Sequence, residues 1–178
     1  MSTALYGPEF FVGRSHTVTL SAFVVAPIVR DLLEPESVLD IGCGQGEWLE
    51  AFALPDMLGV DIAAPEGDQF IRHDLTEPLD LGRRFGLVVC LETGEHLPES
   101  AAGTLVETLV RHGDDILFSA AVPGQEGIGH IHLQPHEYWL AKFAEHGFEV
   151  WDAIRPRIAR DSRVSPWYRN NTFIFQRP

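Results

Sequence analysis

The chain has 178 residues, enough for one domain with a sizeable buried core. Its 26 acidic and 13 basic residues give a formal net charge of −13, which excludes tight, non-specific binding to nucleic-acid phosphates. There is no N-terminal signal pattern and no apolar run near the ~20 residues of a membrane span. We therefore expect a cytoplasmic protein with neither a nucleic-acid nor a membrane partner.

Residues 1–16 are rich in aromatic residues and glycine, and we interpret them as an arm or lid before a single domain over 17–178. In that domain, helices alternate with short apolar strands, which is typical of an α/β fold with a parallel sheet covered on both faces. We expect helices over 17–33, 47–52, 98–112 and 135–146, and strands over 37–41, 57–62, 69–74, 87–91, 116–118, 148–154 and 172–175. A long loop is expected between the last two strands.

The first strand leads into three glycines at alternate positions. Residues 38–46 read V-L-D-I-G-C-G-Q-G, and a helix-like segment follows them. Strand, glycine turn and helix open a mononucleotide-binding unit, in which bare backbone and a helix N-terminus face the ligand. Asp40 lies just before the first glycine, where a carboxylate would repel a pyrophosphate and attract a cation. The sulfonium and ammonium groups of S-adenosylmethionine suit that position.

Residues 38–46 resemble the first motif of the class I S-adenosylmethionine-dependent methyltransferases, which commonly reads V-L-D-I-G-C-G-x-G. The resemblance covers about 17–178 and implies a Rossmann-like sheet of seven mostly parallel strands in the order 3-2-1-4-5-7-6, the last one antiparallel. It implies further that Asp61, at the end of the second strand, binds the ribose of the cofactor and that Asp74 receives the adenine amino group. The alternatives are a surface acid at a strand end for Asp61 and local turn chemistry for Asp74.

The predicted cofactor site takes residues from the ends of the first four strands. It comprises Asp40, Gly42, Cys43, Gly44, Gly46, Asp61, Ile62, Asp74, Leu75, Cys90 and Leu91. The two cysteines fall at the ends of strands that should be neighbours, where a disulfide is geometrically conceivable. A reducing cytosol favours free thiols instead.

The loops after the fourth and fifth strands should hold the methyl acceptor, since the carboxyl ends of parallel strands form the binding edge. A hydroxyl nucleophile must lose a proton, and histidine is the usual base near neutral pH. His130 and His96 are therefore our candidate catalytic bases, and His132 is a third candidate. In the alternative, structural interpretation, Glu95 and His96 form a helix-entry pair, and His132 and His136 are solvated loop residues.

Two further resemblances involve these loops. Residues 92–96 (E-x-x-E-H) and 129–139 (G-H-x-x-x-Q-P-x-x-Y-W) resemble a subgroup of small bacterial methyltransferases, which implies no particular substrate. Glu92, Glu95 and His96 with a later histidine also resemble the E-x-x-E-H…H arrangement of RNA 3′-terminal 2′-O-methyltransferases, which use a divalent ion. Carboxylates and imidazoles suit Mn²⁺, Mg²⁺ or Zn²⁺. The acidity of the chain opposes the RNA interpretation, and we assign no metal ligands, although a divalent ion near these residues and His130 stays open.

The sequence thus predicts a methyltransferase that uses S-adenosylmethionine, releases S-adenosylhomocysteine and methylates a small, hydroxylated or sugar-like molecule by direct displacement. The prediction that oxygen is the nucleophile rests on the histidines alone, so methylation of a nitrogen or carbon atom stays open. The alternatives are metal-assisted methylation of RNA 3′ ends and a non-catalytic module that binds the cofactor. The sequence gives neither the acceptor nor the oligomeric state.

Overall fold

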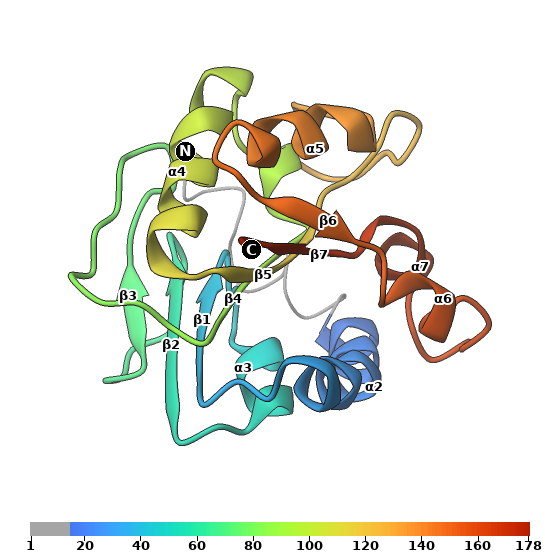
Figure 1. Ribbon diagram of the computed structural model, residues 1–178, viewed down its shortest axis with the longest axis horizontal. Helices are drawn as coiled ribbons and strands as arrows, with labels where there is room; N and C mark the ends of the chain where they lie inside the picture. Colours follow the sequence, from blue (N-terminus) through green and yellow to red (C-terminus); the bar gives the residue numbers. More distant parts are fainter. Residues whose placement is uncertain (1–14) are drawn as a thin grey trace.

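A computed structural model describes residues 15–178, in which helices cover both faces of one central sheet (Figure 1). Of the predicted arm, residues 1–14 lie outside the described part. Residues 15 and 16 form the start of the first described helix.

The described strands form one sheet in the order β3-β2-β1-β4-β5-β7-β6. They are β1 (Ser37–Ile41), β2 (Asp56–Asp61), β3 (Phe70–Arg72), β4 (Leu87–Leu91), β5 (Asp115–Ser119), β6 (Glu149–Trp151) and β7 (Phe173–Gln176). β7 runs antiparallel to β5 and β6, and the other pairs are parallel. The predicted strand order and fold class are confirmed.

The helices follow the prediction in number and place except near the C-terminus. They are α2 (Ser15–Leu33), α3 (Glu47–Phe52), α4 (Ala102–His112), α5 (His136–Ala144), α6 (Arg155–Ile158) and α7 (Pro166–Asn171), with the 3₁₀ turns η2 (Gly94–His96) and η3 (Glu99–Ala101). The expected long loop between β6 and β7 is wrong, because α6 and α7 occupy it. Each of these helices has a proline in its first turn, where the constrained φ of proline suits a helix start.

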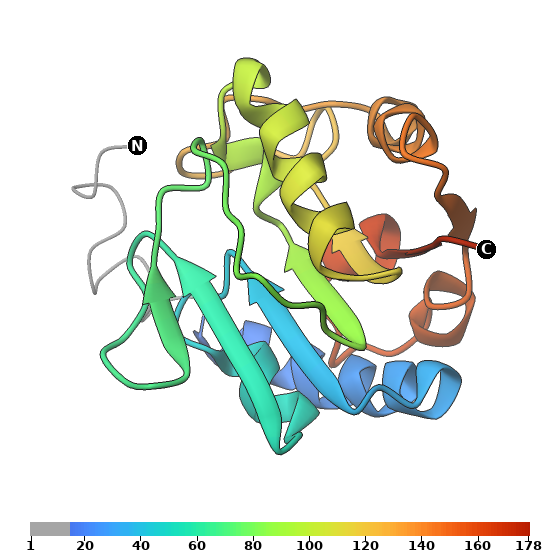
Figure 2. The same ribbon diagram turned by 60° about the vertical axis from the view of Figure 1, so that its left-hand side comes forward.

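Alternate strand residues face two separate apolar cores. On β4, Val88 and Cys90 pack on the side of α4 and α5, whereas Leu87, Val89 and Leu91 pack on the side of α2 and α3. Figure 2 shows α2 and α3 on the opposite face of the sheet from α4. Burial on both faces explains why these strands read as unbroken apolar runs.

Helix α2 is the one helix in the described part that is long and apolar enough to cross a membrane, judged by length and composition over His16–Leu33. Helices that cover a sheet meet the same criterion. Ala22, Val25, Ala26 and Val29 are fully buried in the core shared with α3, so α2 packs as a sheet-covering helix.

Candidate active site

A cavity of about 250 Å³ lies where β1, β2 and β4 end, and the loop after β5 and helices α2, α3 and α7 complete its wall. It brings together nine of the predicted site residues. These are Gly42, Cys43, Gly44, Asp61, Ile62, Leu75, Leu91, His96 and His130. The predicted cofactor residues that do not line it are Asp40, Gly46, Asp74 and Cys90.

The glycine turn after β1 forms the floor of the cavity. Gly42 has a φ of +82°, a conformation that side chains rarely adopt. A Cβ atom on Gly42 would lie 2.2 Å from Oγ1 of Thr93 in the loop after β4. The turn therefore needs glycine both for its backbone conformation and for its close contact with the loop after β4.

Asp61 lies in the cavity wall beside that turn. Its Oδ2 accepts a hydrogen bond of 3.1 Å from the Gly44 N–H, and its Oδ1 accepts one of 2.8 Å from the Ala63 N–H. Burial raises the pKa of Asp61, and these two hydrogen bonds oppose the rise. The carboxylate is thus oriented at the strand end, and its contact with a ribose remains a prediction.

Asp40 lies beneath the turn and is only 2% exposed. Among the described residues its Oδ2 has no hydrogen-bond partner. Burial, together with the charges of Asp61 and Glu47, raises the pKa of Asp40 well above its usual range. A cation held nearby would favour the ionised form of this buried acid, which suits the predicted cationic cofactor.

Among the other predicted cofactor residues, Asp74 takes part in a local turn, and Cys43 and Cys90 are buried thiols. Oδ1 of Asp74 accepts hydrogen bonds from the backbone N–H (3.0 Å) and the hydroxyl (2.8 Å) of Thr76, which is the turn chemistry named as its alternative. Cys43 and Cys90 are both free and buried, as expected. Burial raises the pKa of each thiol, so both stay protonated near neutral pH.

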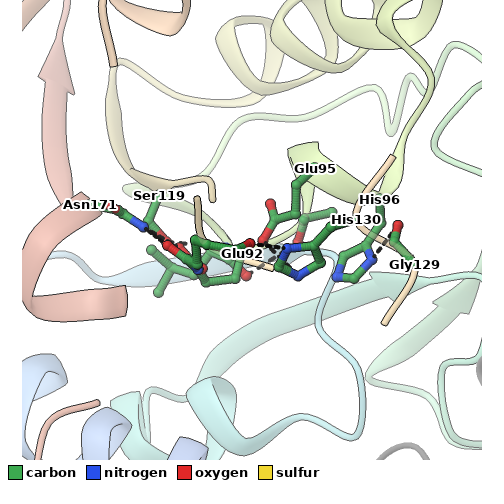
Figure 3. Close-up of polar contacts among 10 residues, drawn as sticks. Glu92, Glu95, His96, Ser119, Gly129, His130 and Asn171 are labelled. Atoms are coloured by element: carbon green, nitrogen blue, oxygen red, sulfur yellow. Dashed lines mark hydrogen bonds and ion pairs between the residues drawn. The ribbon is translucent and has the colours of Figure 1, made fainter. Parts of the chain in front are cut away.

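On the other side of the cavity, His96 and His130 have the same hydrogen-bonding arrangement (Figure 3). Nδ1 of His130 donates to the Gln125 carbonyl over 2.8 Å, and Nδ1 of His96 donates to the Gly129 carbonyl over 3.2 Å. A carbonyl oxygen only accepts, so Nδ1 carries a proton in both rings. The two rings lie edge to face with centroids 5.0 Å apart.

Glu95 is the third member of this group and is fully buried. Its backbone carbonyl accepts hydrogen bonds from the N–H groups of Ile131 and His132, and these bonds hold the loop after β5 against turn η2. Oε1 of Glu95 consequently lies 4.0 Å from Nε2 of His130. One ligand atom each from Glu95, His96 and His130 lie within 4.8 Å of one another, a spacing that a metal ion could span.

Glu92 lines the cavity with this group, but its carboxylate has other partners. Oε2 accepts a hydrogen bond of 2.6 Å from the side-chain amide of Gln125, and Oε1 accepts a longer one of 3.4 Å from Asn171. Figure 3 shows Glu92 between Asn171 on one side and the histidines on the other. Sequence reasoning did not single out Gln125 and Asn171 as site residues, although it placed Gln125 in the loop that should hold the acceptor.

The alternative interpretation, in which His132 and His136 are solvated loop residues, is wrong for His132. This ring is 5% exposed and packs against Tyr138 and Trp139 at centroid distances of 5.3 and 5.8 Å. Burial lowers its pKa. His136 is half-buried and hydrogen-bonds through Nε2 to Oδ1 of Asn171 over 3.1 Å.

Comparison with known proteins identifies the family. Residues 20–153 match the family described as methyltransferase domain. The ubiquinone biosynthesis O-methyltransferase of Azotobacter vinelandii is 31% identical over 148 residues, which cover 74% of this chain and 58% of that protein. Its counterpart from Pseudomonas syringae pv. tomato is 29% identical over 167 residues, 79% of this chain and 66% of that protein. The chain thus spans less than two thirds of the length of either relative.

Solved structures share the fold at low identity. The S-adenosylmethionine-bound amino pentose methyltransferase CalS10 of Micromonospora echinaspora superposes with a TM-score of 0.67 at 17% identity, covering 94% of both chains. DesVI of Streptomyces venezuelae gives 0.66 at 17% identity, covering 100% of this chain and 99% of that one. The methyltransferase domain of bacterial CtHen1-C gives 0.63 at 13% identity, covering 90% of this chain and 98% of that one. The chain therefore belongs to the methyltransferase-domain family and contains a class I methyltransferase domain.

Proposed function

We propose that this methyltransferase methylates a hydroxyl oxygen of a small molecule and that His130 is its general base. His130 carries this proposal, because its Nδ1 donates to the Gln125 carbonyl and the residue lines the cavity that also holds the glycine turn and Asp61. The relatives in Azotobacter and Pseudomonas are O-methyltransferases, which supports oxygen over nitrogen or carbon as the nucleophile.

In the proposed step, Nε2 of His130 takes the proton of the acceptor hydroxyl while the oxygen attacks the methyl carbon of S-adenosylmethionine. A new C–O bond forms as the C–S bond breaks. The electron pair of that bond neutralises the sulfonium, so S-adenosylhomocysteine leaves and the proton remains on His130. The sulfonium is already a good leaving group, so the protein contributes mainly alignment and proton removal.

The cavity wall indicates the charge of the acceptor. Glu92, Glu95 and Glu126 line the part next to the histidines, and the described lining contains neither lysine nor arginine. A phosphate or carboxylate on the acceptor would be repelled there. The proposed acceptor is therefore a neutral or cationic hydroxylated molecule, such as a sugar-like compound, rather than RNA.

The test is the release of S-adenosylhomocysteine in the presence of a panel of neutral hydroxylated sugars and phenols. Substituting His130→Gln should lower kcat about 10²- to 10⁴-fold, because the base is lost. The affinity for S-adenosylhomocysteine, measured by calorimetry, should stay within about twofold, as the cofactor contacts remain. His146→Gln, in the turn that follows α5 and outside the cavity lining, is the matched control. Full activity of His130→Gln would contradict the proposal.

A second candidate is metal-assisted methylation, which the spacing of Glu95, His96 and His130 favours. In metal sites, a ligating histidine usually donates its other ring N–H to a carbonyl or carboxylate, as both histidines do here. A divalent ion held by these residues would lower the pKa of a bound hydroxyl and remove the need for a histidine base.

Calorimetry distinguishes the two candidates. Metal-stripped protein titrated with Mn²⁺ should give no heat if His130 is a free base. Binding that disappears in Glu95→Gln and His96→Gln, but persists in the exposed control Glu99→Gln, would establish the metal site instead. The activity would then depend on Mn²⁺ and be lost on adding a chelator.

A further inference from the structure

A chain of side-chain hydrogen bonds leads from helix α5 to the cavity. Nε2 of His136 bonds to Oδ1 of Asn171 over 3.1 Å, and Nδ2 of Asn171 donates to Oε1 of Gln125 over 2.8 Å. Nε2 of Gln125 then donates to Oε2 of Glu92 over 2.6 Å. The four residues come from α5, α7, the loop after β5 and the end of β4, so the chain joins segments that are distant in the sequence.

Every bond in this chain has the same direction. The oxygens of the Glu92 side chain accept, and the NH₂ groups of Gln125 and Asn171 face toward them. Their carbonyl oxygens consequently face back, and Oδ1 of Asn171 requires a proton on Nε2 of His136. Hydrogen bonds aligned in this way polarise and strengthen one another. Asn171 is 1% exposed, so its amide cannot replace these hydrogen bonds with bonds to solvent water.

Gln125 also contacts His130. Its backbone carbonyl accepts the hydrogen bond from Nδ1 of His130, while its side chain holds Glu92. One residue thus sets both the orientation of the Glu92 carboxylate and the tautomer of His130. Loop residues around Gln125 have few other side-chain anchors, because Glu126, Gly127 and Ile128 are exposed.

The backbone of Glu92 is strained where this chain ends. Its φ is +52°, which is unfavourable for a residue with a side chain. Its N–H donates to both the carbonyl (3.0 Å) and the hydroxyl (3.1 Å) of the buried Ser119. These contacts from β5 and the side-chain contacts from Gln125 and Asn171 hold the strained conformation and aim the carboxylate.

We propose that Gln125 and Asn171 are positioning residues of the methyltransferase: they orient Glu92 and hold His130 in the Nδ1–H tautomer, in which Nε2 is the proton acceptor of the proposed reaction. Asn171 acts on Glu92 directly and through Gln125, and Gln125 acts through Glu92 and His130. The inference rests on the proposed role of His130 as the base. It adds to that role the residues that keep the base in its working form.

The experiment uses ¹⁵N-histidine-labelled protein saturated with S-adenosylhomocysteine. Long-range ¹H–¹⁵N correlation spectra distinguish the two ring tautomers, because protonated and bare nitrogens have different chemical shifts. The wild type should show His130 as Nδ1–H. Asn171→Asp has the same shape but cannot donate to Gln125, so His130 should become a mixture of tautomers. Asn170→Asp, which makes the same chemical change at an exposed position on α7, should leave His130 unchanged.

The kinetic counterpart is measured with the acceptor that responds in the hydroxylated panel. Asn171→Asp should lower kcat by on the order of 10- to 100-fold through misalignment, with the affinity for S-adenosylhomocysteine unchanged. If Asn171→Asp does not fold, Gln125→Glu tests the same link, because it replaces the donor to Glu92 with a second carboxylate on a half-buried loop.

An Nε2–H tautomer of His130 in the wild type, or an unchanged tautomer and kcat in both variants, would overturn the inference. Failure of the proposed function gives a different result. In that case His130→Gln retains full activity, whatever the tautomer of the wild-type ring.

Discussion

The backbone N–H of Gly44 donates a hydrogen bond of 3.1 Å to Oδ2 of Asp61 and so joins the glycine turn after β1 to the end of β2. Both residues line the cavity. The parallel pairing of β1 with β2 aligns Ile41 with Val60, which places the turn and the acid next to each other at the carboxyl edge of the sheet. This geometry places the Asp61 carboxylate beside the glycine turn in the predicted cofactor site.

Asp61→Ala should weaken the binding of S-adenosylhomocysteine by about 10- to 100-fold. The substitution removes the carboxylate predicted to accept the ribose hydroxyls, and hydrogen bonds to a charged group contribute about 1.5–3 kcal/mol. It also frees the N–H groups of Gly44 and Ala63 that the acid now orients. Isothermal titration calorimetry measures the change, with the exposed Asp68→Ala as the control. Equal affinities for the two variants would contradict the assignment.

Gly42→Ala should destabilise the protein more than Gly82→Ala. Both glycines have positive φ, at +82° and +65°, so each substitution carries the backbone cost of about 1–2 kcal/mol. Only at Gly42 would the new Cβ also overlap Thr93, whereas nothing lies within 4 Å of a Cβ at Gly82. Overpacking adds about 1–3 kcal/mol. Urea unfolding of the two variants gives the difference directly, and equal losses would show that the contact with Thr93 relaxes freely.

Asp40→Asn should stabilise the cofactor-free protein at neutral pH. Burial raises the folded-state pKa of Asp40 above its unfolded value. Its contribution to stability is therefore present below the unfolded pKa of about 3.9 and is lost as the pH rises through the raised folded pKa. Removing the titration should flatten the dependence of unfolding free energy on pH in that window.

The same substitution should weaken binding of S-adenosylmethionine, because its cationic groups would lose a buried acid. Unfolding curves at several pH values and calorimetry on Asp40→Asn test both effects. The exposed Glu50→Gln on α3 is the control. If Asp40→Asn is less stable than the wild type at neutral pH, the interpretation that the ionised Asp40 destabilises the cofactor-free protein is contradicted.

The thiols of Cys43 and Cys90 should not react with Ellman's reagent in the native protein at pH 8. Both are buried, at 4% and 0% exposure, and burial, followed by the charge of Asp40, raises the pKa of each thiol. Reaction requires the exposed thiolate. In denaturant both thiols should react. Rapid labelling of either cysteine under native conditions would show that the end of β1 or β4 opens.

The sheet could be predicted from the sequence because its strands are buried on both faces and read as short, continuous apolar runs. The cofactor side could be predicted because the glycine turn and Asp61 are adjacent in one βαβ unit, where local geometry sets their spacing. Helices α6 and α7 were missed, although Pro156 and Pro166 mark their first turns. Both helices are too short, at 4 and 6 residues, to show a helical period of apolar residues.

The sequence by itself determined the apolar strands, the glycine turn and the presence of histidines in the loops after β4 and β5, and its resemblance to a known family implied the strand order. Only the tertiary structure decided what those loops do. Asn171 reaches Glu92 across 79 positions of sequence because β7 pairs with β5 and brings α7 beside the cavity. The tautomer of His130 likewise depends on a carbonyl whose direction is set by the folded loop. Such hydrogen bonds form only where donor and acceptor lie about 3 Å apart at a suitable angle. Neither the composition nor the spacing of residues along the chain determines that geometry.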